Sequence, residues 1–121
     1  MTNTIENLLT RNLLEVFGES NAVKRRLAIA ALWAEDCVFV DPFGSYVGYT
    51  ALNEAVSQLH AKFPGFHFAP IGAPQAFRDV GRLAWGHGPV GGPPKVTGLD
   101  VVTVRDDRIA ALYAFIDTPV T

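Results

Sequence analysis

The second half of the chain carries a repeated pattern of apolar runs and tight turns, and this pattern constrains the fold most strongly. Pro64-Gly65 ends the last helical pattern. Beyond it, Gly91-Gly92-Pro93-Pro94 and Arg105-Asp106-Asp107-Arg108 each join two apolar runs over a few residues. Strands joined so closely pair antiparallel. We therefore expect antiparallel strands over residues 66–71, 82–88, 95–104 and 109–116, with a weaker strand at 77–79.

Helical patterns dominate the first half. Apolar residues recur at helical spacing, and Gly18 ends the first of these stretches. Helices are expected over residues 5–17, 22–34 and 51–62, with short strands at 37–40 and 46–48. We expect the apolar side of the second helix to include Leu27 and Trp33, and its solvated side to carry Lys24, Arg25 and Arg26.

This order of elements predicts an α+β fold. A cone-shaped, curved antiparallel (mixed) sheet would wrap around the three helices of the first half and enclose an apolar pocket. The 121 residues are expected to form a single domain, 1–121, because 49% hydrophobic and 18% charged residues suit one core.

Composition argues against several classes of function. The net charge is −2 and the only basic cluster is Lys24-Arg25-Arg26, so we expect no nucleic-acid or membrane partner. The single cysteine, Cys37, has no partner for an internal disulfide, and the N-terminus carries no signal-peptide pattern. We therefore expect a cytoplasmic protein.

Phosphate-binding loops and metal-ligand spacing are absent from the sequence, so no cofactor and no metal are expected.

Two carboxylates occupy apolar surroundings. Asp41 closes the apolar run Cys37–Val40, just before the turn at Pro42–Gly44, and Asp100 lies inside the run 96–104. Burial raises the pKa of an acid, which suits proton transfer. Asp41 is a candidate base and Asp100 a candidate oxyanion partner. The structural alternatives are an Asp-Pro turn at Asp41 and, at Asp100, either a pair with a cation such as Lys95 or a solvent-facing position at the start of a strand.

Other residues are candidates for the pocket. His87 follows Leu83 and Trp85 on one strand face and is a candidate acid, base or ligand contact, the alternative being a hydrogen-bonded histidine that lines the sheet. His60 is expected to be half-exposed near the pocket mouth, and His67 to face away from the core. Many of the aromatic residues would also serve as core. We expect the ligand-binding wall to include Trp33, Phe39, Phe43, Tyr46, Leu59, Phe63, Phe68, Trp85 and Leu112.

Three segments carry a resemblance to a known superfamily. They are 32–45 (LWAEDCVFVDPFGS), Gly98-Leu99-Asp100 and Arg105–Ile109. Together with the order of elements, they make the chain similar to the nuclear transport factor 2-like superfamily, and within it to the SnoaL-like polyketide cyclase and ketosteroid isomerase branch. The resemblance covers nearly the whole chain.

The resemblance implies a cofactor-independent isomerase-type proton transfer on a small hydrophobic carbonyl compound, steroid- or polyketide-like. Asp41 matches the base of ketosteroid isomerases, and Asp100 matches their protonated oxyanion partner, an acid that an apolar site keeps neutral. The family also has a Tyr on the first helix, where this chain offers Leu13, Leu14 and Phe17. Tyr46, Tyr49 and Tyr113 are the only possible substitutes.

Two alternatives remain open on the same scaffold. One is a non-catalytic domain for small-ligand binding or dimerisation, which the missing Tyr favours. The other is an epoxide hydrolase or dehydratase, which needs a further set of polar residues that the sequence does not reveal. If Leu112 and Ala114 face the pocket, Tyr113 and Phe115 lie on the outer sheet face, and a homodimer is expected there.

Overall fold

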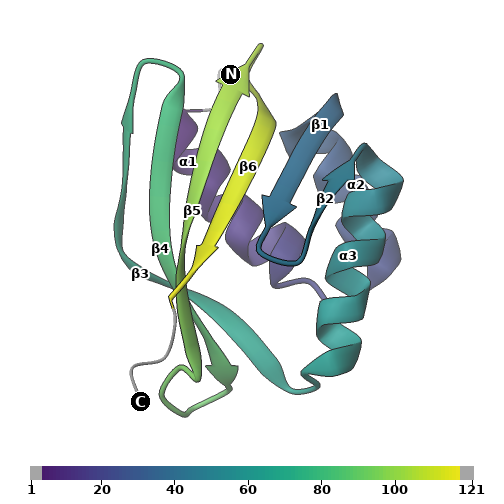
Figure 1. Cartoon of the computed structure of the whole chain (residues 1–121), viewed down its shortest axis with the longest axis vertical. Helices are drawn as coiled ribbons and strands as arrows, with labels where there is room; N and C mark the ends of the chain where they lie inside the picture. Colours follow the sequence, from purple (N-terminus) through teal and green to yellow (C-terminus); the bar gives the residue numbers. More distant parts are fainter. Residues whose placement is uncertain (1–3, 118–121) are drawn as a thin grey trace.

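A computed structural model describes residues 4–117 and places helices on one side of a curved sheet (Figure 1). The helices are α1 (Ile5–Arg11), the π-helix η1 (Asn12–Phe17), α2 (Ala22–Leu32) and α3 (Tyr49–Lys62). The strands are β1 (Trp33–Asp41), β2 (Gly44–Val47), β3 (Phe66–Phe77), β4 (Val80–Pro89), β5 (Val96–Arg105) and β6 (Arg108–Ile116).

The six strands form one mixed sheet in the order β2-β1-β6-β5-β4-β3. β1 runs parallel to β6, and every other neighbouring pair is antiparallel. The sheet is open, with β2 and β3 at its edges, and it curves around the helices (Figure 1). This architecture confirms the expected α+β fold and the antiparallel order of the second half.

The first helix changes from α to π geometry at Asn12. Its π-helical part, η1, forms one wall of the cavity described below. Its end is marked by the Gly18 N–H, which donates to the Leu13 carbonyl five residues back at 2.9 Å. The Phe17 carbonyl lies 2.7 Å from His60 Nε2 on α3, so this ring nitrogen carries the proton and donates. The bond satisfies a carbonyl at the helix end and fixes η1 against α3.

The core lies between the helices and the concave face of the sheet. A Cβ atom at Gly81 on β4 would lie 2.4 Å from Ile5 Cγ2 and 2.9 Å from Leu9 Cδ1, so only glycine lets α1 approach the sheet this closely. The fully buried large side chains include Leu8, Leu9, Leu13, Ile29, Leu32, Trp33, Leu52, Leu83, Ile109 and Leu112.

The second helix differs from the prediction in its end and in its buried face. It ends at Leu32, because Trp33 already pairs with Ile109 in the sheet. Leu27 is 70% exposed, whereas Arg25 is 1% exposed. The Arg25 guanidinium donates to Asn53 Oδ1 at 2.8 Å, to Ser57 Oγ at 2.7 Å and to main-chain carbonyls, and these bonds offset its burial.

Smaller differences concern element boundaries. The two strands expected at 66–71 and 77–79 are one strand, β3, whose register shifts between Ile71 and Gln75. The third helix begins two residues earlier than expected, at Tyr49, with Gly48 as its N-cap at φ 87°. Within residues 4–117, no helix is long and apolar enough to cross a membrane.

Candidate active site

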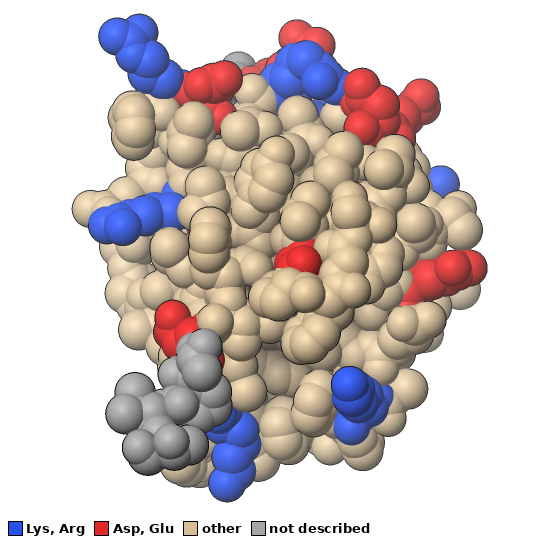
Figure 2. Space-filling view, in the orientation of Figure 1, with Lys and Arg blue, Asp and Glu red and all other residues tan. Residues whose placement is uncertain are grey.

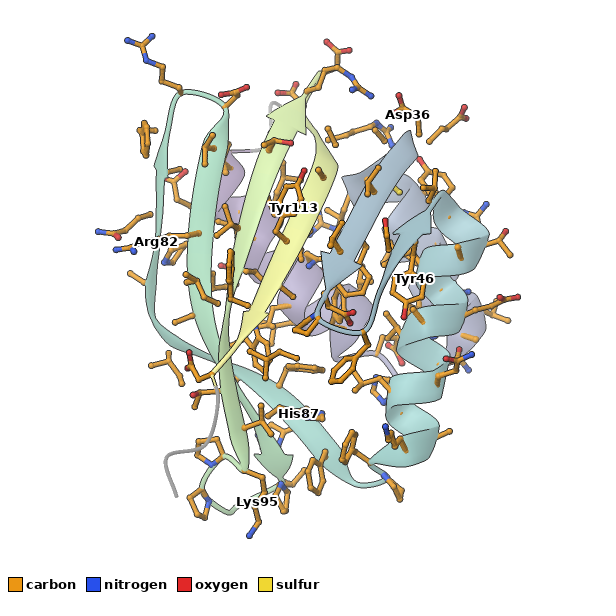
Figure 3. The ribbon with its side chains drawn as sticks, in the orientation of Figure 1. Asp36, Tyr46, Arg82, His87, Lys95 and Tyr113 are labelled. Atoms are coloured by element: carbon orange, nitrogen blue, oxygen red, sulfur yellow. The ribbon has the colours of Figure 1, made fainter. Side chains whose placement is uncertain are left out.

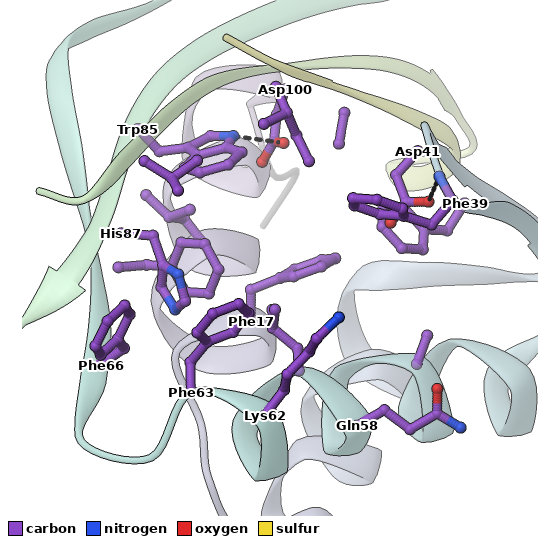
Figure 4. A pocket seen from close by; sticks show the side chains of 18 of the residues that line it. Phe17, Phe39, Asp41, Gln58, Lys62, Phe63, Phe66, Trp85, His87 and Asp100 are labelled. Carbon is purple, nitrogen blue, oxygen red and sulfur yellow. Dashed lines mark hydrogen bonds between the residues drawn. The ribbon is translucent and has the colours of Figure 1, made fainter. Parts of the chain in front are cut away.

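A cavity of about 460 Å³ opens between the concave face of the sheet, η1 and α3 (Figure 4). Its volume lies within the range typical of small-molecule sites, about 300–1,000 Å³. Most of its wall is apolar and aromatic. The aromatic residues that line it are Phe17, Phe39, Phe43, Tyr46, Phe63, Phe66, Phe68 and Trp85.

Asp100 is the buried carboxyl group of this cavity. It lies on the inward face of β5, 4% exposed, and its Oδ1 accepts a hydrogen bond from Trp85 Nε1 at 2.9 Å (Figure 4). Burial raises the pKa of Asp100 to about 7, although the Trp85 N–H favours the ionised form. Because Trp85 occupies only Oδ1, a proton on Oδ2 is free to serve as a donor.

Trp85 reaches Asp100 because Gly98 has no side chain. Trp85 and Gly98 are cross-strand partners on β4 and β5. A Cβ atom at Gly98 would lie 2.2 Å from Trp85 Cζ2 and 2.5 Å from the Phe115 carbonyl oxygen. The indole therefore lies across Gly98 and points its N–H at the carboxyl group two residues further along β5.

Gly98→Ala is expected to displace the Trp85 indole and break its bond to Asp100. Overpacking of this kind costs about 1–3 kcal/mol of unfolding free energy. Denaturant unfolding, followed by tryptophan fluorescence, measures the loss. Gly92→Ala is the matched control, because a Cβ there meets nothing nearer than the Pro89 carbonyl oxygen at 3.7 Å. Equal stability of the two variants would contradict this account of Gly98.

Asp41 lies at the end of β1 and lines the same cavity as Asp100 (Figure 4). Its Oδ1 accepts the backbone N–H of Phe43 at 2.8 Å and of Gly44 at 3.0 Å. The structural alternative for this residue, a capped Asp-Pro turn, is therefore present. Both bonds go to Oδ1, so the turn leaves Oδ2 unused, and the catalytic role of Asp41 stays a prediction.

His87 is buried in an aromatic cluster on the sheet side of the cavity. Its ring stacks on Phe68 with 4.2 Å between centroids and meets Phe63 and Phe66 edge-on. Burial lowers the pKa of His87, and the nearby His60 and His67 lower it further. The imidazole is therefore neutral at pH 7, which suits hydrogen bonding to a ligand better than charge pairing.

The three tyrosines have different surroundings. Tyr46 lines the cavity and stacks on Phe39 with 5.6 Å between ring centroids. The Tyr49 hydroxyl donates to the Trp33 carbonyl at 2.6 Å, and Tyr113 lies on the outer face of the sheet (Figure 3). At the first helix, Leu13 and Phe17 line the cavity instead of a tyrosine. Of the candidate substitutes, only Tyr46 is in the cavity.

Most residues expected in the ligand-binding wall line the cavity, and two do not. Trp33 and Leu112 are both fully buried in the core. Trp33 opens β1 and its Nε1 donates to Asn12 Oδ1 at 2.8 Å, and neither residue lines the cavity. Leu112 faces inward as expected, but the cavity begins only at the next inward residue of β6, Ala114.

Several lining residues are not identified as site residues by the sequence pattern. They include Lys62 and Gln58 on α3, and Lys95 just before β5. The helical pattern contains a signal for Gln58 and Lys62, because both lie close to Leu59 on the surface of the helix, and Leu59 is expected in the wall. His60, expected near the mouth, binds the Phe17 carbonyl. In the described part of the chain, no group of three or more His, Cys, Asp or Glu residues is placed to hold a metal ion.

Comparison with solved structures finds this fold repeatedly. A candidate isomerase of the SnoaL-like family from Agrobacterium tumefaciens is 26% identical with a TM-score of 0.85, covering 92% of this chain and 95% of its own. A candidate ketosteroid isomerase from Kribbella flavida is 13% identical (TM-score 0.73, covering 96% and 79%). A candidate polyketide cyclase from Sinorhizobium meliloti is 17% identical with a TM-score of 0.69, and the match covers 89% of this chain and 93% of that chain.

Comparison with curated proteins gives no match. The family model of the SnoaL-like domain matches residues 11–112, from the end of α1 to the middle of β6. This range contains both carboxylates of the cavity, Asp41 and Asp100, and the indole that bonds the second. The chain therefore belongs to the SnoaL-like domain family, as its sequence resemblance implied.

Proposed function

We propose that this protein catalyses a cofactor-independent proton transfer on a small hydrophobic carbonyl compound. The observation that carries the proposal is Asp100, a carboxyl group buried in an apolar cavity, bonded by Trp85 and with its pKa raised to about 7. Perturbed acids of this kind cluster at functional sites. Asp41 shares the cavity and supplies a second carboxylate of different surroundings.

The two carboxylates take different parts in the proposed reaction. Asp41 Oδ2 accepts a proton from the carbon next to the carbonyl, and the electron pair of that C–H bond forms a carbon–carbon double bond as the carbonyl oxygen becomes an oxyanion. Protonated Asp100 donates a hydrogen bond to that oxyanion. Asp41 then returns the proton to another carbon of the same conjugated system, so isomerisation is complete without a cofactor.

His87 and Tyr46 are the auxiliary groups in this proposal. The neutral imidazole of His87 is held by its aromatic neighbours and is available to bond a polar atom of the ligand. The Tyr46 ring lies beside the Asp41 turn, since a Cβ atom at Gly44 would be 3.1 Å from its hydroxyl oxygen. The phenol is therefore placed near the base rather than at the first helix.

The test is conversion of a β,γ-unsaturated ketosteroid to its conjugated isomer, followed by ultraviolet absorbance. Turnover that depends on Asp41 supports the proposal and shows that the protein works without a tyrosine on its first helix. The absence of turnover in folded protein, with the ketosteroid and with smaller unsaturated ketones, would reject the catalytic proposal.

A non-catalytic ligand-binding role is the second candidate. It is favoured by one observation: Leu13 and Phe17 occupy the first-helix wall, where ketosteroid isomerases have their tyrosine donor. Loss of one oxyanion donor typically costs about two to three orders of magnitude in rate. Under this alternative, hydrophobic carbonyl compounds bind the cavity and are recovered unchanged.

We also propose that the chain forms a homodimer through the outer face of its sheet. Charged side chains lie mostly at the rim of that face, and its centre is largely uncharged (Figure 2). Tyr113 and Phe115 of β6 are 43% and 59% exposed on this surface.

Sizing chromatography is expected to give twice the chain mass of 13.1 kDa. Phe115→Lys is expected to shift elution to the monomer; a monomeric wild type would contradict the proposal.

A further inference from the structure

The cavity that we propose as the reaction site carries unpaired positive charge at its opening. Lys62, in the last turn of α3, and Lys95, just before β5, both line it, and both residues are exposed. They stand on separate elements, a helix and the connection between two strands. The acidic residues of the wall are Asp41 and Asp100.

Lys62 is directed into the cavity. Figure 4 shows its side chain running from α3 toward the middle of the pocket. Its Nζ lies 6.0 Å from the centroid of the Phe63 ring, at the outer limit of a cation–π contact. Within residues 4–117 the ion pairs are Arg11–Glu15 and Arg105–Asp36, so no carboxylate of this part of the chain pairs with it.

Lys95 adds a second ammonium at one end of the same opening. Its backbone N–H donates to the His87 carbonyl at 2.9 Å, and this bond fixes the start of β5 beside β4. Figure 3 shows its side chain at the hairpin end of the molecule, extending toward solvent. It therefore contributes a field at the rim of the cavity rather than a contact inside it.

The lysines gather at the cavity, although the chain as a whole is slightly acidic. The chain has an excess of acids, 12 Asp and Glu against 10 Lys and Arg, and its lysines are Lys24, Lys62 and Lys95. Two of these three line one cavity. The negative charge of Asp41 opposes an anion there, but the Phe43 and Gly44 N–H groups bonded to its Oδ1 partly offset that charge.

We propose that the substrate is a keto acid: a flat apolar body that carries the reacting carbonyl and one carboxylate, with the carboxylate held at the mouth by Lys62 and the field of Lys95. The apolar body would lie among the rings of Phe17, Phe39 and Phe68, with the carbonyl toward Asp100. This inference rests on the proposed function for the position of the carbonyl, and on the two lysines alone for the anionic end.

Binding of two matched probes tests the inference without any turnover. 2-Naphthylacetate and 2-naphthylacetamide share one apolar body and differ in the charge of the head group. Calorimetric titration at low salt is expected to show about fivefold tighter binding of the acid, since an exposed ion pair contributes up to about 1 kcal/mol. The preference is expected to shrink in about 0.5 M NaCl, because salt screens exposed charges.

Variants of the lysines identify the source of the preference. Lys62→Met keeps most of the length of the side chain and removes its charge, so most of the preference for the acid should disappear, leaving only the part that the field of Lys95 supplies. Lys24→Met, on the exposed side of α2, should leave the preference unchanged. Equal affinities in the wild type, no measurable binding of either probe, or a preference that Lys62→Met leaves unchanged would each overturn the inference. Failure to turn over ketones, with the acid preference intact, would reject only the catalytic proposal.

Discussion

Asp41→Asn is expected to lower kcat for ketone isomerisation by at least about a thousandfold. A positioned general base typically contributes a factor of about 10²–10⁴, and here the same group also returns the proton. The carboxamide keeps an oxygen in the place of Oδ1, so the bonds from the Phe43 and Gly44 N–H groups persist. The change removes the base and leaves the turn.

The measurement is single-substrate kinetics on protein whose melting temperature is unchanged. Asp79→Asn is the control, since Asp79 is exposed in the β3–β4 turn and lies outside the cavity wall. Full activity in Asp41→Asn would remove Asp41 from the mechanism and leave its carboxylate with the structural role of capping the turn.

The fold is predictable because the second half of the chain is punctuated by turn residues at short intervals. Gly and Pro clusters fix where strands end, and alternation fixes which side chains face inward. The inward positions of Leu83, Trp85 and His87 on β4 follow from that period alone, and all three are buried. On β6 the alternation leaves open which set of side chains faces inward, and the structure turns Leu112 and Ala114 inward and exposes Tyr113 and Phe115.

The helices and the depth of the cavity are less predictable from the sequence. The helical period shows that one face of a helix is apolar, but a modest rotation of the helix about its axis fits the same pattern. The burial of Arg25 depends on hydrogen-bond acceptors from Asn53 and Ser57, which are far away in the sequence. Trp33 and Leu112 are apolar, inward residues, and their place in the core rather than in the cavity wall depends on how the helices pack on the sheet. The Trp85–Asp100 bond depends on Gly98, whose role is visible only once β4 and β5 are paired.

Asp100→Asn is expected to change how stability depends on pH. The pKa of Asp100 is about 7 in the folded protein and 3.8 in its ordinary state. Between these values the folded state holds a proton that the unfolded state releases, so the unfolding free energy of the wild type falls as pH rises through this window. At about 1.36 kcal/mol per pKa unit, the loss attributable to Asp100 between about pH 5 and pH 8 is about 2–3 kcal/mol.

The asparagine variant has no proton to lose at this position, so its unfolding free energy should lack the fall of about 2–3 kcal/mol that Asp100 causes between about pH 5 and pH 8. Denaturant unfolding of both proteins at the two ends of this pH range measures it as a difference, in which the other titrating groups cancel. Asp106→Asn, in the exposed β5–β6 turn with φ 53°, should behave like the wild type. Parallel pH dependence in wild type and Asp100→Asn would show that Asp100 is ionised in the folded protein across this range.

The same titration is expected to shape catalysis. Protonated Asp100 is a hydrogen-bond donor to the oxyanion, whereas the ionised form is a buried negative charge beside it, so wild-type kcat/KM should fall about tenfold per pH unit above about pH 7. The carboxamide of the Asp100→Asn variant carries an N–H donor at every pH. The activity of this variant should therefore be lower than that of the wild type near pH 6 but remain level to about pH 9. A decline above neutral pH of equal steepness in both proteins would assign it to a different group.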